Sequence, residues 1–190
     1  MVAVEPISST FRRLLDNVNV NAINERVRVF NIGMGACEGR LRFSDSFDAE
    51  NHVVFDDTAQ GVHAVDVQVR ALDDLLGDER PIMIKMDVEG FETEVIRGGA
   101  AVFGSQQLQA LLIELNGAGA RYGFDENAIR DRLENWGLHL CNYDPLIRKL
   151  QPQARGDVAM HGNSLYVRDF KSAQARLSAA APFHVLGRLV

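Results

Sequence analysis

The chain has 190 residues, enough for one domain with a sizeable buried core. Its 46% hydrophobic and 24% charged residues are ordinary for a soluble globular protein, which argues against a disordered or fibrous chain. The net charge of −6, without a Lys/Arg-rich run, argues against nucleic acid as the main partner. No apolar run approaches the roughly 18 residues of a membrane helix, so we expect no membrane partner.

The two cysteines, Cys37 and Cys141, have neither metal-ligand spacing nor the pattern of a disulfide framework. They suit a reducing compartment, and Met1 leads directly into VAVEP with no signal-peptide pattern. The sequence therefore predicts a cytoplasmic protein.

The chain opens with a short strand, Val2–Val4, that ends at Glu5 and Pro6. Apolar residues at helical spacing follow, with serines at 8 and 9 as candidate caps. In Rossmann-like folds, an acid at the end of the second strand hydrogen-bonds the ribose hydroxyls of a nucleotide cofactor. Glu5 is therefore a candidate ribose ligand. The alternative is an acid that is simply favourable beside a helix N-terminus.

The next strand covers residues 27–32 and leads into NIGMGACEG. One interpretation makes Gly33–Gly39 a dinucleotide-binding loop, with Asp56 or Asp57 at the distance of a ribose acid. Such a loop should open a helix, but RLRFSDSF has no apolar stripe of helical period. The other interpretation is a strand and its turn, before short strands near 39–43, 53–55 and 65–69.

The most informative stretch is PIMIKMDVEGFETEVIRGG, residues 81–99. The run Ile82–Met86 has the length and composition of a strand buried on both faces, interrupted by Lys85. Asp87 and Glu89 follow, and then a helical pattern that Gly98 can close. Ligands of open α/β sheets bind at the carboxyl ends of the strands, where these two acids would lie.

The second half predicts a strand over Ala110–Leu115 with Glu114 near its carboxyl end. A helix capped by Asp125 comes next, then a strand at 138–141. We interpret residues 142–163 as a polar loop long enough to contact a substrate. A strand at 165–167 and a helix from Phe170 complete the chain. The scattered histidines, His63 among them, are interpreted as structural or exposed.

The stretch KMDVEGFETEVIRGG resembles the signature of the FkbM-type methyltransferase family, and the resemblance extends from Val2 to about Asp169. It implies a Rossmann-like, three-layer α/β fold that uses S-adenosyl-L-methionine. In that family Glu5 would bind the ribose, and Asn31 and Gly33 would contact the adenine end, where Gly33 replaces the usual alanine. The family begins with a strand and a glycine-rich loop, whereas this sequence starts at its second strand. The matching residues are Lys85, Asp87, Val88, Glu89, Gly90, Glu92 and Gly98.

Methyl transfer is an in-line displacement, for which the protein aligns the acceptor and excludes water. For a hydroxyl acceptor a nearby base adds acceleration, and the candidates are Asp87, then Glu89, then Glu114. The alternatives are that Glu89 caps the following helix, that Glu92 is a first-turn helix acid, and that Lys85 neutralises the carboxylates. We expect no metal site, because no cluster has convincing ligand spacing.

The sequence thus predicts one methyltransferase-like domain over residues 1–190, with 1–169 resembling the family and 170–190 forming a C-terminal helix and tail. The expected activity is O-methylation of a hydroxyl on a small molecule or sugar. One alternative is a non-catalytic fragment or binding module of the same fold. The other is a nucleotide-dependent oxidoreductase that uses the Gly33–Gly39 loop. The apolar tail from Pro182 favours docking or a homo-oligomer.

Overall fold

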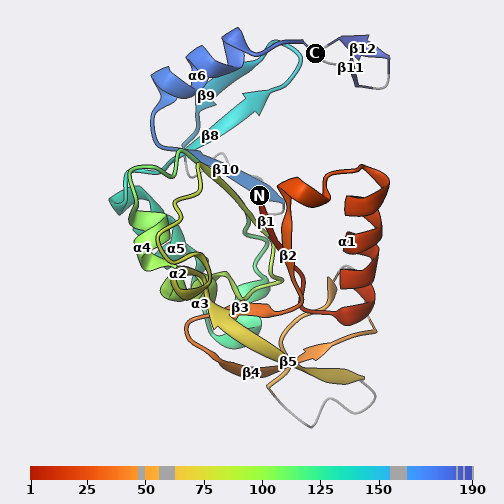
Figure 1. Ribbon diagram of the computed structural model, residues 1–190. Helices are drawn as coiled ribbons and strands as arrows, with labels where there is room; N and C mark the ends of the chain where they lie inside the picture. Colours follow the sequence, from red (N-terminus) through yellow and green to blue (C-terminus); the bar gives the residue numbers. More distant parts are fainter. Residues whose placement is uncertain (47–49, 56–62, 155–161, 183, 186, 190) are drawn as a thin grey trace. The chain divides into compact units, whose positions relative to one another are not determined.

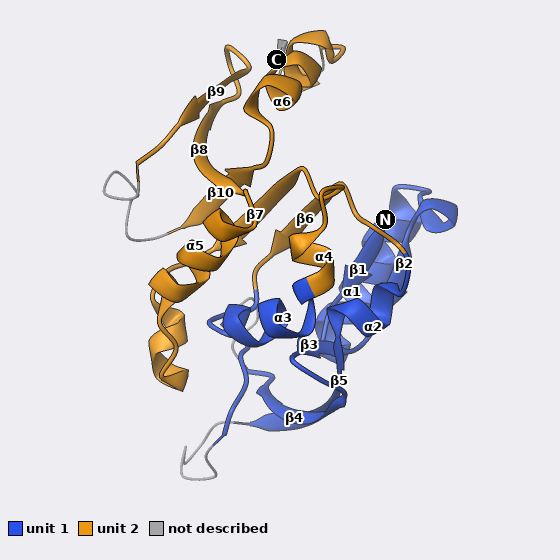
Figure 2. Cartoon of the chain, turned by 90° about the vertical axis from the view of Figure 1, so that its left-hand side faces the viewer, with its two compact units in different colours: residues 1–78, 88–100 blue, residues 79–87, 101–190 orange. Residues whose placement is uncertain are grey.

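The computed structural model describes residues 1–46, 50–55, 63–154, 162–182, 184–185 and 187–189. The chain divides into two units, each made of two separate stretches of sequence (Figure 2). Unit 1 contains residues 1–78 and 88–100, and unit 2 contains residues 79–87 and 101–190. One crossing between the units falls inside the Asp-Val-Glu-Gly segment, between Asp87 and Val88.

Unit 1 begins with a β-α-β arrangement. Strand β1 (Val2–Val4) pairs in parallel with β2 (Arg28–Phe30), and helix α1 (Ser8–Val20) and the 3-10 helix η1 (Asn24–Arg26) connect them. Figure 1 shows α1 alongside the two strands. The predicted strand and helix are confirmed, but the serine cap is wrong. Ile7 is the N-cap residue without a side-chain bond, because the Ser8 hydroxyl donates to Asn31 Oδ1 instead.

A second sheet of unit 1 has the order β3-β5-β4. Strand β3 (Gly33–Gly35) is parallel to β5 (Ala64–Ala71), and β4 (Gly39–Ser44) is antiparallel to it. The glycine-rich segment Gly33–Gly39 therefore forms strand β3 and leads into strand β4. It opens no helix, so the dinucleotide-loop interpretation is wrong. Asp56 and Asp57, its candidate ribose acids, lie outside the described residues.

Helices α2 (Leu72–Leu76) and α3 (Glu92–Gly98) complete unit 1, and α3 contacts β3 and β5. The helix approaches β3 so closely that a Cβ atom on Gly98 would lie 2.0 Å from the carbonyl oxygen of Gly35. A side chain of any size is therefore excluded at residue 98, because a backbone atom cannot move aside as a flexible side chain can. The predicted helix end at Gly98 is confirmed. The reason for a glycine at this position is the close packing of α3 against β3.

We predict that Gly98→Ala lowers the free energy of unfolding by about 1–3 kcal/mol, the usual cost of overpacking a core. Urea unfolding followed by circular dichroism would measure it. Gly39→Ala is the matched control in the same unit, because a Cβ there meets nothing within 4 Å. Equal stability of the two variants would contradict the close approach of α3 to β3.

Unit 2 is built on a five-stranded sheet with the order β6-β7-β10-β8-β9. Strands β6 (Met83–Met86) and β7 (Ala110–Glu114) are parallel. Strand β10 (Asn163–Val167) lies antiparallel between β7 and β8 (His139–Asp144), so β6, β7 and β8 run in the same direction. Strand β9 (Lys149–Pro152) forms a hairpin with β8.

The helices of this part of the chain are α4 (Ala100–Gly104), η3 (Ala118–Tyr122), α5 (Glu126–Asn135) and α6 (Phe170–Ala179). The Asp125 side chain accepts from the amide of Asn127, which confirms the predicted cap. Figure 1 shows α6 alongside β8 and β9. The tail forms a small antiparallel pair, β11 (His184–Val185) and β12 (Arg188–Leu189).

Two predictions for unit 2 are wrong. The first residues of the central strand are exposed, Ile82 by 55% and Met83 by 56%, and among the described residues β6 pairs with β7 alone. The segment 142–163 is not one long loop, since residues 142–152 belong to the β8–β9 hairpin. The polar local sequence did not indicate this hairpin, because the residues that pack against it include Phe170 and Leu177, which lie far along the sequence.

The guanidinium of Arg168 joins three segments of unit 2. It donates to the carbonyl oxygens of Leu108 at 2.8 Å and Phe103 at 3.2 Å, and also to that of Trp136. Desolvation by burial lowers the pKa of Arg168. The three carbonyls lie at or near the ends of helices and turns, where backbone carbonyls often lack an intrahelical donor. The planar fork of an arginine can satisfy all three at once.

We predict that Arg168→Met lowers the free energy of unfolding by about 3 kcal/mol or more, because it leaves carbonyl groups without donors. Arg168→Lys should be intermediate, since a single ammonium cannot reach three separated carbonyls. Arg176→Met on the exposed surface of α6 is the control and should be neutral. Urea unfolding of the three variants measures the differences, and a neutral Arg168→Met would contradict this role.

No helix within the described ranges combines the length and the apolar character that crossing a membrane requires.

Candidate active site

Two of the candidate cofactor residues, Glu5 and Asn31, lie directly after β1 and β2. Glu5 continues the parallel pairing, because its amide donates to the Phe30 carbonyl at 3.1 Å. Its Oε1 accepts from the amide of Ile7 at 2.8 Å, which fixes one carboxylate oxygen at the start of α1. Burial raises the pKa of Glu5, and the hydrogen bond from Ile7 offsets part of that rise. Glu5 is thus a half-buried acid with one carboxylate oxygen held by the backbone.

Asn31 holds the turn that carries Glu5. Its Nδ2 donates to the carbonyls of Glu5 and Pro6, each at 2.9 Å, and its Oδ1 accepts from the Ser8 hydroxyl at 2.9 Å. Both groups of the amide are therefore engaged with the β1–α1 turn. The sequence placed Asn31 at the adenine end, and the structure gives it these contacts, which fix the backbone around Glu5.

We predict that Asn31→Asp lowers the free energy of unfolding by about 1–3 kcal/mol. The carboxylate still accepts from Ser8, but it cannot donate to the carbonyls of Glu5 and Pro6 and repels both. Asn17→Asp on the exposed face of α1 is the control. A chemical denaturation series at neutral pH would measure both variants, and the idea fails if they are equally stable.

Gly33, the third candidate cofactor residue, is buried in β3 opposite Val69 of β5. A Cβ atom there would lie 3.0 Å from the ring of Phe43 and 3.1 Å from Val69. This crowding explains a glycine at a position where the family usually has alanine. Its contact with a cofactor stays a prediction.

A cavity of about 320 Å³ adjoins the turn of Glu5. It lies wholly within unit 1, between the start of α1 and strand β5. Its wall includes Ile7, which binds the Glu5 carboxylate, and Asn31, which binds the Glu5 backbone. The lining residues are Pro6, Ile7, Ser8, Ser9, Arg12, Asn31, Asp45, Val65, Asp66, Val67 and Gln68.

In unit 2, the candidate acids Asp87 and Glu114 come together at the carboxyl ends of the parallel strands β6 and β7. A carboxylate oxygen of Asp87 lies within 4.8 Å of one of Glu114. Lys85 Nζ binds Asp87 Oδ2 at 2.8 Å, as one of the sequence interpretations proposed. The lysine supplies a cation beside one of the two acids.

Glu89 belongs to unit 1 and has a backbone conformation that side chains rarely adopt, with φ of +53°. Gly90 follows with φ of +96°. The interpretation of Glu89 as the helix cap is wrong, because Phe91 is the N-cap residue of α3 and no side chain caps it. Glu92 is confirmed as the first-turn acid, and its buried carboxylate accepts from the Gly90 amide at 3.2 Å. The strained turn at Glu89 is therefore held from within α3.

A family model described as a methyltransferase FkbM domain matches residues 1–143. The chain belongs to the FkbM methyltransferase family. The crystal structure of a methyltransferase FkbM from Methylobacillus flagellatus KT is similar, with 18% sequence identity and a TM-score of 0.53. The similarity covers 87% of this chain and 36% of that protein, so the chain spans about a third of its length. Among curated proteins, no match is found.

These comparisons confirm the predicted family and the Rossmann-like α/β fold of this FkbM-family chain. The roles of Glu5, Asn31, Gly33, Asp87, Glu89 and Glu114 stay predictions.

Proposed function

We propose that residues 1–190 work as one methyltransferase-like domain that transfers a methyl group from S-adenosyl-L-methionine to a hydroxyl group of a small molecule or sugar. The family supports methyl transfer in general. The observation that supports S-adenosyl-L-methionine as the cofactor is the half-buried carboxylate of Glu5. The Ile7 amide orients this carboxylate, and a cavity adjoins the turn that holds it.

The Glu5 carboxylate fits a ribose. Two carboxylate oxygens suit two adjacent hydroxyl donors, and the Ile7 amide leaves lone pairs on both of them. Burial of a carboxylate without a cationic partner disfavours its charged form, which is why the pKa of Glu5 is raised. A ligand that donates hydrogen bonds to this carboxylate would relieve that cost. The acid is therefore better explained by a ligand than by the stability of the turn.

When bound, S-adenosyl-L-methionine supplies an electrophilic methyl group on a sulfonium. On the acceptor side, we assign the general base to Asp87, with Glu89 and Glu114 as the further candidates. The Asp87 carboxylate takes the proton of the hydroxyl as the acceptor oxygen attacks the methyl carbon, and the carbon–sulfur bond breaks with its electrons left on sulfur. Lys85 fixes one oxygen of Asp87, so the other oxygen is the one aimed at the proton.

A second candidate is a binding module that holds the nucleoside without catalysis. The observation in its favour is that the described strands β1 and β6 each pair with one strand. A catalytic alignment of donor and acceptor needs more rigidity than binding does. Nucleoside binding without methyl transfer to any hydroxyl acceptor would identify this candidate.

For the setting of this function we propose the cytoplasm. Both cysteines are free thiols in the structure, Cys37 exposed and Cys141 buried, which suits a reducing compartment. The proposed partners are the cofactor and a small-molecule or sugar acceptor, with no nucleic acid and no membrane, and a homo-oligomer through the C-terminal tail.

We predict that calorimetric titration of the 190-residue chain with S-adenosylhomocysteine shows binding, and that Glu5→Gln weakens it about 10- to 100-fold, the value of hydrogen bonds to a charged group. Glutamine keeps an acceptor for the Ile7 amide but removes the charge. Glu25→Gln, on the exposed surface of η1, is the control. Folded wild-type chain that does not bind S-adenosylhomocysteine would refute the proposed cofactor.

The pH dependence should separate a binding role of Glu5 from a structural one. The pKa of Glu5 is raised above the ordinary 4.5. As the solution is acidified, the affinity of the wild-type chain for S-adenosylhomocysteine should therefore begin to fall while the pH is still above 4.5. The folded state favours the protonated acid, so this group's stabilising contribution is present at low pH and lost as the pH rises through its pKa. Glu5→Gln should therefore keep or gain stability at neutral pH, with an affinity independent of pH. A less stable Glu5→Gln would favour a structural role.

A further inference from the structure

Three adjacent strands of unit 2 each carry a polar side chain at the same end of the sheet. Asn163, the first residue of β10, is paired with Glu114, the last residue of β7. The register of β6 on β7 pairs Met86 with Ile113, so Asp87 comes beside Glu114. Residues that face each other across two strands have side chains on the same face of the sheet, about 5 Å apart at Cβ. Asp87, Glu114 and Asn163 therefore form one polar row across the three strands.

The face of the sheet that holds the polar row is accessible, whereas the opposite face is packed. Successive side chains of a strand point to opposite faces. On the opposite face these strands carry only buried residues next to the row: Met86, Leu111, Ile113, Ser164 and Tyr166. In the row itself, Asp87 and Asn163 are exposed and Glu114 is half-buried. The next pair on the same face, Leu112 and Leu165, is half-buried. A ligand can therefore reach the row.

The members of the polar row differ in the hydrogen bonds that they can make. Asp87 and Glu114 hold carboxylate oxygens within 4.8 Å of each other, and ionised carboxylates only accept hydrogen bonds. Asn163 adds a carboxamide, which accepts on its oxygen and donates from its nitrogen. Two carboxylates disfavour an anionic ligand such as a phosphate. The row therefore suits a neutral ligand with more than one hydroxyl group.

Two neighbouring hydroxyl groups match the order of the row. A hydroxyl has one proton to donate and two lone pairs that accept. The first hydroxyl donates to Asp87, and the second donates to Glu114 while it accepts from Asn163 Nδ2. Without Asn163 the second hydroxyl would face a carboxylate alone, and its lone pairs would lose water without gaining a donor. The carboxamide is thus the group that distinguishes a diol from a single alcohol.

We propose that Asn163 is a specificity-determining residue for the methyl acceptor, and that the acceptor is a vicinal diol of the kind that sugars carry. The proton of the first hydroxyl goes to Asp87, its oxygen forms the new bond to the methyl carbon, and the electrons of the broken carbon–sulfur bond stay on sulfur. The second hydroxyl keeps its proton, and its contacts with Glu114 and Asn163 align the first one. This inference rests on the proposed function and narrows its class of acceptor.

The test compares the binding of cis-1,2-cyclohexanediol and cyclohexanol to the 190-residue chain, with S-adenosylhomocysteine present. NMR titration can follow the backbone amide of Glu114. The wild-type chain should bind the diol about 10- to 100-fold more tightly, because its second hydroxyl bonds to a carboxylate. Asn163→Leu should weaken diol binding about 3- to 10-fold, the value of a neutral hydrogen bond, and leave cyclohexanol binding unchanged. Asn127→Leu, on the exposed surface of α5, is the control and should keep the wild-type preference.

The outcomes separate this inference from the proposed function. If the wild-type chain binds S-adenosylhomocysteine but binds both probes equally, or neither, the diol assignment is overturned while cofactor binding stands. If Asn163→Leu keeps the wild-type preference, the role of Asn163 is overturned. If S-adenosylhomocysteine does not bind, the proposed cofactor fails, and the same titration without it still compares the two probes. Partial unfolding of a variant would weaken both probes alike, so the ratio of their affinities reports on the row itself.

Discussion

The contact on which unit 1 depends is the approach of α3 to the backbone of β3, where no atom fits between Gly98 and the Gly35 carbonyl. It sets how the helix after the Asp-Val-Glu-Gly segment lies on the sheet. The start of that helix then fixes the turn before it, because the buried Glu92 carboxylate binds the Gly90 amide. Neighbouring acids of this motif therefore have different structural environments. Glu92 supports the backbone, while Glu89 has a positive φ that side chains rarely adopt.

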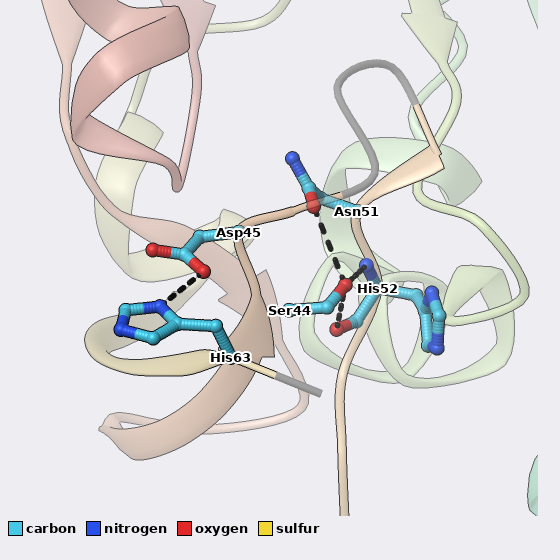
Figure 3. Close-up of polar contacts among 5 residues, drawn as sticks. All are labelled: Ser44, Asp45, Asn51, His52 and His63. Carbon is cyan, nitrogen blue, oxygen red and sulfur yellow. Dashed lines mark hydrogen bonds and ion pairs between the residues drawn. The ribbon is translucent and has the colours of Figure 1, made fainter. Parts of the chain in front are cut away.

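The cofactor half of the proposed site follows from the same kind of support. Asn31 fixes the turn around Glu5, the Ile7 amide fixes the Glu5 carboxylate, and His63 Nδ1 lies 2.6 Å from Asp45 Oδ1 in the cavity wall (Figure 3). Each polar group is oriented before any ligand arrives, which lowers the entropy cost of binding. The raised pKa of Glu5 shows the cost of such an arrangement, since burial disfavours the charge that a ribose would require. These oriented polar groups support the proposed binding of a nucleoside by unit 1.

In unit 2 the corresponding interaction is made by Arg168, whose guanidinium donates hydrogen bonds to three backbone carbonyls from separate segments. The paired acids Asp87 and Glu114 lie at the carboxyl ends of β6 and β7. Their proximity follows from strand direction, because β6 and β7 are parallel and in register from Met83 and Ala110 onward. Structural support and candidate chemistry are thus carried by different residues within the same sheet.

The sequence by itself determined the family, the order of most helices and strands, and the strand ends at Glu5, Asp87 and Glu114, because apolar periodicity and acids after strands are local signals. Only the tertiary structure decided what depends on partners distant in the sequence. What covers Ile82 and Met83 is decided by the surroundings of β6, which among the described residues pairs with β7 alone, and the β8–β9 hairpin packs against α6. The Asp45–His63 pair and the Asn31 contacts join residues 18 to 26 positions apart, and no spacing rule predicts them. Such contacts form only once β4, β5 and α1 have taken their places.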